Sequence, residues 1–230
     1  MNRIVRAAFL ACLLWASCVA PATADDPKMP AATRSDYVAM LYERMTNPHP
    51  EFGDWIRQMP EYKNAAMLDK QTVFDGKADQ LKDAYNRIIV VEPVVVSANV
   101  RISPYSAMGG GFLVQSFNDI TFFHYDYLGR RYALIPQGIT GYQWLKAPVS
   151  ESPRIMRETG NGSRAHLVLS LMPFTADAKP MEMEKREYRL IMAEIVKIEM
   201  WSGDGKRILW DSTMNAPSTL RSKLLNMYNR

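Results

Sequence analysis

EYRLIMAEIVKIEMW, residues 187–201, is the segment that most constrains the fold of this chain. Its Glu, Lys, Arg and Met content favours a helix. Its apolar residues nevertheless alternate as on one face of a strand, with Glu194 as an interruption: Leu190, Met192, Val196, Ile198 and Met200. Ser202-Gly203-Asp204-Gly205 then offers turn geometry that its glycines permit. We therefore predict a strand over 187–201 that pairs with another over 206–211.

Upstream of this segment the sequence predicts further strands. Residues 96–102 and 165–171 carry apolar side chains at alternate positions, which is typical of a half-buried strand. Residues 112–114 predict a short strand. Two runs over 120–127 and 132–135 flank Leu128-Gly129-Arg130 and predict a hairpin.

Helical patterns mark both ends of the chain. Apolar residues recur at helical spacing over 35–45, around 55–59 and over 74–88, and a short helix is predicted over 153–159. Residues 220–228 predict a closing helix. No repeat or linker divides residues 35–230. The chain is therefore expected to form one α+β domain, with N-terminal helices packed on a mostly antiparallel sheet of about six to eight strands and a closing C-terminal helix.

Residues 1–24 have the order of a bacterial secretory signal. Arg3 and Arg6 precede an apolar run over 7–19, and Ala22-Thr23-Ala24 fits the small-x-small pattern of signal peptidase. The run is shorter than the roughly 20 residues that a membrane-spanning helix needs. We expect a periplasmic or secreted protein with no membrane span after cleavage, and a flexible leader over 25–34.

Cys18 leaves an alternative open. Ala16-Ser17-Cys18 resembles the end of a lipoprotein signal, in which lipidation of the cysteine would tether the domain to a membrane. Both cysteines, Cys12 and Cys18, lie within the signal, so cleavage after Ala24 leaves a cysteine-free chain. Cysteine nucleophiles, disulfides and cysteine-based zinc sites are then excluded.

The charge of the mature chain is close to neutral. The sequence has 28 Lys and Arg against 24 Asp and Glu, and loss of Arg3 and Arg6 leaves 26 against 24. Both signs are interspersed without a long basic block. The sequence therefore has no electrostatic footprint for nucleic acid.

Several catalytic motifs are absent. Gly109-Gly110-Gly111-Phe112 is similar to the oxyanion-hole glycines of some esterases, but no Gly-x-Ser-x-Gly elbow accompanies it. We interpret these glycines as a loop that enters a strand at Phe112. The sequence also lacks His-Glu-x-x-His, a phosphate-binding loop and a calcium loop.

Two sets of residues suggest a metal site. His124 and Asp126 lie two apart in a predicted strand and share one face, and His166 would complete a set of two imidazoles and a carboxylate. The set resembles, in spacing only, the ligand pattern of the iron- and oxoglutarate-dependent oxygenases, whose distal basic residue has no match in this chain. Met181 and Met183 are soft ligands of the kind that copper handlers use, although methionines also fill irregular cores.

Aromatic residues mark a candidate binding surface in the middle of the chain. Tyr125 and Tyr127 share a strand face, and Tyr132 and Trp144 lie nearby in sequence. Tyrosine rings on an exposed face can stack on sugars or grip a protein. Aromatic pairs also stabilise ordinary hairpins.

Three hypotheses remain open. The favoured one is a non-catalytic binding or interaction module that uses the aromatic hairpin, with an envelope protein or a glycan as partner and no cofactor. The second is a metal-handling protein with copper or iron. The third is a cell-envelope hydrolase that uses carboxylates not identified from the sequence. The oligomeric state is not determined by the sequence.

Overall fold

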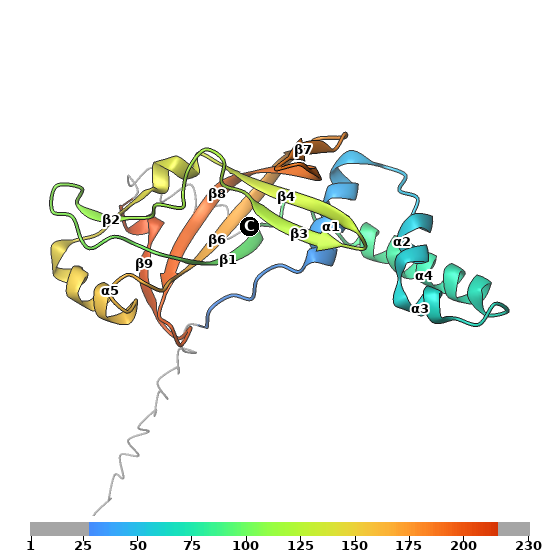
Figure 1. Ribbon diagram of the computed structural model, residues 1–230, viewed down its shortest axis with the longest axis horizontal. Coiled ribbons are helices and arrows are strands. Elements are labelled where there is room, and N and C mark those ends of the chain that lie inside the picture. The colour runs from blue at the N-terminus through green and yellow to red at the C-terminus, as the bar shows by residue number, and fades with distance from the viewer. Residues whose placement is uncertain (1–27, 216–230) are drawn as a thin grey trace, which may run out of the picture.

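A computed structural model describes residues 28–215 of the chain. Figure 1 shows a group of helices beside a large sheet. The helices are α1 (Ser35–Thr46), α2 (Gly53–Gln58), α3 (Pro60–Asn64), α4 (Lys70–Asn86) and α5 (Ser152–Glu158), with the 3-10 turns η1 (Ile139–Tyr142), η2 (Val149–Glu151) and η3 (Ser212–Asn215). The strands are β1 (Val94–Val100), β2 (Gly111–Leu113), β3 (Phe123–Tyr127), β4 (Arg130–Gln137), β5 (Trp144–Lys146), β6 (Ala165–Ala176), β7 (Met181–Met183), β8 (Arg186–Trp201) and β9 (Ile208–Asp211).

β8 is the central strand of a seven-stranded sheet. The order along the sheet is β1-β6-β8-β4-β3, and β7 and β9 also pair with β8. Only the β4–β8 pair is parallel among the described strands. The predicted α+β class and mostly antiparallel sheet are therefore confirmed. The predicted closing helix over 220–228 lies outside the described residues.

β8 has a bulge close to the Glu194 that interrupts the sequence pattern. Lys197 pairs with Ser170 and Ile195 with Leu171, so Val196 is an extra residue. Because one extra residue exchanges the two faces of a strand, the prediction that Leu190 and Met192 share the face of Ile198 is wrong. Residues on either side of the bulge reach the main core in opposite phase: Ile191 and Ala193 before it, Ile198 and Met200 after it.

The first half of β8 is buried on both faces. Its opposite face carries Tyr188 and Leu190, which form a second cluster with Ala133 of β4. Phe122 packs edge-on against Tyr188, with ring centroids 5.4 Å apart. This double burial explains why Arg189 is the only charged residue over 188–193.

α1 fastens the helices to the sheet. Six consecutive residues over 38–43 are buried, so the helix is covered on all sides. It contacts β3, β6 and β8 on one side and α4 on the other. The remaining N-terminal helices pack mainly on one another and project beyond the sheet (Figure 1).

The triple glycine is structural, as the sequence suggested. A Cβ on Gly109 would lie 2.4 Å from the Trp144 ring. A Cβ on Gly111 would meet the Leu145 carbonyl oxygen, because β2 pairs closely with β5 at this point. The loop therefore needs glycine to let the backbone approach β5.

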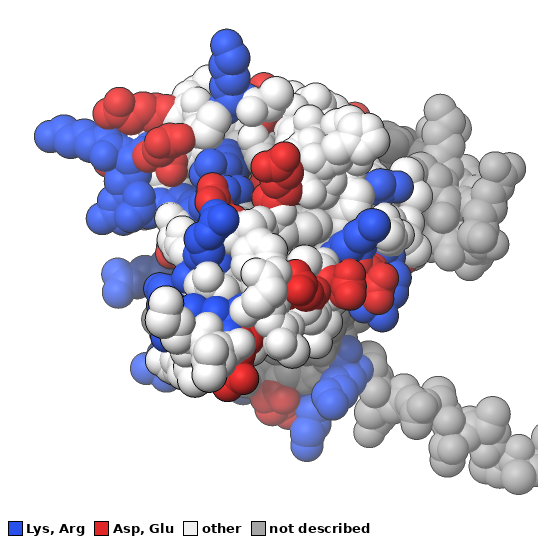
Figure 2. Space-filling model, turned by 90° about the vertical axis from the view of Figure 1, so that its right-hand side faces the viewer, with Lys and Arg blue, Asp and Glu red and all other residues white. Residues whose placement is uncertain are grey.

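The surface shows no separation of charge on the helical side. Figure 2, which faces that end, shows basic and acidic side chains next to one another. No helix in residues 28–215 combines the length and apolar character that crossing a membrane requires.

The bulge makes a testable distinction between neighbouring residues. Ile191→Ala should lower the free energy of unfolding by about 2–5 kcal/mol, because its side chain is fully buried in the core. Met192→Ala should cost about 1 kcal/mol or less, because Met192 is only partly buried. Urea denaturation measures both. Equal losses would contradict the exchange of faces at Val196.

Candidate functional site

An extended arm over residues 28–34 crosses the molecule before α1. Its Met29 N–H donates to the Gly205 carbonyl at 3.1 Å, in the turn between β8 and β9. Its Thr33 N–H donates to the Val95 carbonyl at 2.8 Å, and the Val95 N–H donates to Thr33 Oγ1 at 2.9 Å. The arm is therefore held at both ends, against the β8–β9 turn and against β1.

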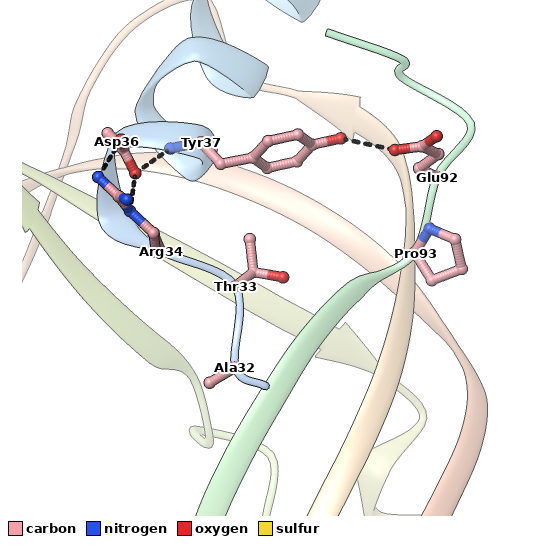
Figure 3. A pocket seen from close by; sticks show the side chains of 7 residues that line it. All are labelled: Ala32, Thr33, Arg34, Asp36, Tyr37, Glu92 and Pro93. Carbon is pink, nitrogen blue, oxygen red and sulfur yellow. Dashed lines mark hydrogen bonds and ion pairs between the residues drawn. The ribbon is translucent and has the colours of Figure 1, made fainter. Parts of the chain in front are cut away.

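A hollow of about 470 Å³ lies between the arm, the start of α1 and the loop before β1. Figure 3 shows the Tyr37 side chain reaching across it, with the hydroxyl 3.4 Å from Glu92 Oε2. Arg34 donates to both carboxylate oxygens of Asp36, at 3.1 and 2.8 Å. Burial raises the pKa of Tyr37, and the Glu92 carboxylate raises it further, so the hydroxyl stays protonated at neutral pH.

Two further hollows share residues with the first. The hairpin hollow, of about 250 Å³, is lined by Ala32, Val96, Ser97, Phe122, Phe123, His124 and Tyr125. The helix hollow, of about 300 Å³, is lined by Asp36, Tyr37, Met40, Leu81, Ala84, Arg87, Ile88 and Tyr127. Ala32 belongs to the first two, and Asp36 and Tyr37 belong to the first and third. We call the three together the arm groove.

Tyr125 and Tyr127 both line the arm groove. Each is half-buried, since it also packs against the main core. Tyr127 meets Trp55 edge to face, with ring centroids 5.2 Å apart. Burial raises the pKa of Tyr125 to about 12, so its hydroxyl remains a hydrogen-bond donor at neutral pH. None of the hydrogen bonds within residues 28–215 uses that hydroxyl, which leaves it available to a ligand.

The hairpin hollow lies between residues of two strands that are edges of the described sheet. Val95 turns its backbone groups away from β6 toward the arm, and in an antiparallel strand residues two apart do the same. The N–H and C=O groups of Ser97 and Asn99 therefore also point to the outer edge of β1. By the same rule His124 points its backbone groups to the outer edge of β3. Within the described residues these groups bond to no other backbone.

A partly buried ion pair fixes α1 against the hairpin. Arg130, at the start of β4, lies 3.3 Å from the Glu43 carboxylate and 3.8 Å from that of Asp54. Its guanidinium also lies over the Trp55 ring, 5.7 Å from the centroid. Burial raises the pKa of Glu43, although Arg130 acts in the opposite direction. The pair therefore links α1, which carries Tyr37 and Met40, to the hairpin that carries Tyr127.

The other two predicted aromatic residues lie outside this groove. Tyr132 is fully buried and packs edge-on against Tyr42, with centroids 5.6 Å apart. Trp144 belongs to the separate β2–β5 sheet and packs on Gly109. The four residues therefore do not form one exposed surface. Tyr132 stands opposite Tyr125 in the β3–β4 ladder but is fully buried, and Trp144 belongs to another sheet.

The proposed metal ligands are also dispersed. His124 and Asp126 share the outer face of β3, and Asp126 lies 3.8 Å from Arg131. Both ring nitrogens of His166 are hydrogen-bonded to side chains of β1. Met181 and Met183 lie on β7, where Met183 packs on the second cluster. Within residues 28–215 no group of three His, Cys, Asp or Glu side chains is placed to hold a metal ion. Metal binding by His124, Asp126 and His166, or by Met181 and Met183, stays a prediction from the sequence.

Sequence reasoning missed the arm, Tyr37 and Ser97 as parts of a site. The sequence pattern places Tyr37 only on a helix face, and Ser97 only on the polar side of a strand. Nothing local in the sequence indicates that residues 28–34 return to β1.

The chain matches no family model, no curated protein and no solved structure.

The Glu43–Arg130 pair predicts an unusual dependence on pH. A raised pKa means that the folded state binds the proton more tightly than the unfolded state, so the contribution of Glu43 is greatest at acidic pH and falls as pH rises through its raised pKa. Glu43→Gln should therefore gain melting temperature relative to the parent between pH 4 and pH 8. A gain that shrinks over this range would contradict the raised pKa.

Proposed function

We propose that this protein is exported to the bacterial periplasm and binds an extended segment of an envelope protein in the arm groove. One observation carries the proposal. The aromatic-lined hairpin hollow lies between β1 and β3, the two strands that end the strand order of the large sheet. Export is supported by the signal pattern in residues 1–24.

The arm itself supports an extended ligand. Its Thr33 already bonds to the outer edge of β1 at Val95, so this edge accepts an extended backbone. Beyond Val95 the pairing stops within the described residues, and the backbone groups of Ser97 and Asn99 continue the same row. Addition of a strand to an exposed edge is a common mode of peptide recognition, in which backbone bonds give affinity and side-chain hollows give specificity.

The tyrosines support the same class of ligand. Tyr125 presents an available hydroxyl in the hairpin hollow, and Tyr127 and Tyr37 line the helix hollow. Half-buried rings lose little conformational entropy when a ligand covers them. A glycan could also stack on these rings, but only a polypeptide matches a row of strand-spaced N–H and C=O groups.

Peptides selected from a random phage-displayed library against the purified protein would test the proposal. We expect selected peptides to lose at least about tenfold in affinity for Tyr125→Ala, since buried aromatic side chains carry much of the energy of binding interfaces. N-methylation of alternate peptide bonds should abolish binding in one register only, because only every second amide faces β1.

Two variants separate this result from a general effect. Tyr125→Phe keeps the ring and should reduce affinity less than Tyr125→Ala. Phe174→Ala removes an aromatic side chain that is 46% exposed outside the arm groove, and should leave binding unchanged. Peptides that bind all variants equally, or a library that yields no binding peptide, would contradict the proposal.

A further inference from the structure

Three side chains on β1 and β6 form a connected hydrogen-bond relay. Ser97 Oγ and His166 Nε2 lie 2.8 Å apart, and His166 Nδ1 and Asn99 Oδ1 lie 2.9 Å apart. Ser97 and Asn99 share one face because they are two apart in β1, and His166 stands opposite Asn99 in the ladder. The relay is therefore built by strand register and does not depend on a loop.

The chemistry of Asn99 sets the direction of the relay. In the orientation that the structure gives, Asn99 presents its amide oxygen to the ring. This oxygen can only accept, so His166 Nδ1 carries the proton that it donates to Asn99. The neutral ring then has its lone pair on Nε2, which accepts the hydrogen of Ser97. This is the order of an activated nucleophile: a hydroxyl, a base within hydrogen-bond reach, and a third group that orients the base.

We propose that Ser97 is the nucleophile of a serine esterase site that acts on esters of small carboxylic acids, with His166 as general base and Asn99 as the residue that positions it. The proposal does not rest on the peptide-binding function, although both use the hairpin hollow. It also differs from the esterases that carry a Gly-x-Ser-x-Gly elbow, since Ser97 lies within a strand.

The surroundings of Ser97 provide the other parts that acyl transfer needs. Ser97 lines the hairpin hollow, whose volume of about 250 Å³ and aromatic walls suit a short acyl group. The Ser97 N–H points to the outer edge of β1 and has no backbone partner in the described residues, so it can donate to the oxyanion as the nucleophile's own amide does in known triads.

The reaction balances without a cofactor. Ser97 Oγ bonds to the ester carbonyl carbon while its proton passes to His166 Nε2. The bond between that carbon and the alcohol oxygen breaks, and the alcohol leaves with the proton from His166. Water then attacks the acyl-Ser97 ester, giving its proton to His166. The acid leaves, and the proton returns to Ser97 Oγ.

Hydrolysis of p-nitrophenyl acetate and butyrate by the purified full chain tests the proposal. Ser97→Ala and His166→Gln should each lower kcat/KM at least about 100-fold, the scale of general base catalysis. A fluorophosphonate probe should label Ser97, as located by mass spectrometry. The matched controls are Ser170→Ala, a serine on the same face of β6, and His49→Gln, a histidine in a turn; both should retain parent activity.

Asn99 has a readout of its own. Asn99→Ala should lower kcat/KM about tenfold, and Asn99→Asp should restore it with the acidic limb of the pH–rate profile moved to higher pH, because a carboxylate favours protonated His166. The other charged groups near the relay are Lys197 and Glu199 of β8, which form an ion pair, and Arg101, which follows β1. The Asn99 variants keep all three residues, so a shift of the pH–rate profile reports the change at residue 99.

The outcomes are decisive in either direction. Melting temperatures of the variants must lie within a few degrees of the parent, so that loss of activity is not loss of fold. The proposal is overturned if the fluorophosphonate probe labels a residue other than Ser97, or if Ser97→Ala retains the activity of the parent. Peptide binding that persists in Ser97→Ala would leave the proposed binding function standing, because this variant keeps the backbone N–H of residue 97.

Discussion

The rest of the structure depends on β8 being paired along both of its edges. β6 runs along one edge over most of its length, while β4 and β9 divide the other. A single bulge at Val196 lets the strand change phase between these partners. The first half is then buried on both faces, and the second half returns its apolar side chains to the main core. Because every other strand of the large sheet takes its register directly or indirectly from β8, this phase change also sets which residues of β1 and β3 face each hollow.

Much of the fold could be predicted from local pattern. Alternation in residues 96–102 and 165–171, and the turn glycines at 203 and 205, indicated strands close to β1, β6, β8 and β9. The bulge could not be predicted. Glu194 breaks the apolar alternation of the segment, but nothing in the sequence shows that Val196 is an extra residue in the ladder. The parallel pairing of β4 with β8 was also outside local reasoning, because it joins segments about 50 residues apart.

The candidate site was predicted only in part, for a similar reason. Alternation correctly placed Tyr125 and Tyr127 on one face of the hairpin, and the structure brings both to the arm groove. Tyr132 and Trp144 are near them in sequence but belong to the core and to another sheet. The arm and Ser97 enter the site through tertiary contacts alone, and the hydrogen bonds of His166 arise from the register of β1 with β6. Residue type suggested a metal ligand at His166, whereas geometry places it between a hydroxyl and an amide oxygen.

The arm groove therefore rests on one structural condition, which is that the outer edge of β1 beyond Val95 is open. Amide hydrogen exchange of the purified protein, followed residue by residue by NMR, tests this condition most directly. Val96 and Ala98 donate into the β1–β6 ladder and should exchange slowly, whereas Ser97 and Asn99 should exchange orders of magnitude faster. Equal protection of all four amides would show that another segment already covers the edge, and would contradict a groove that is open to a peptide.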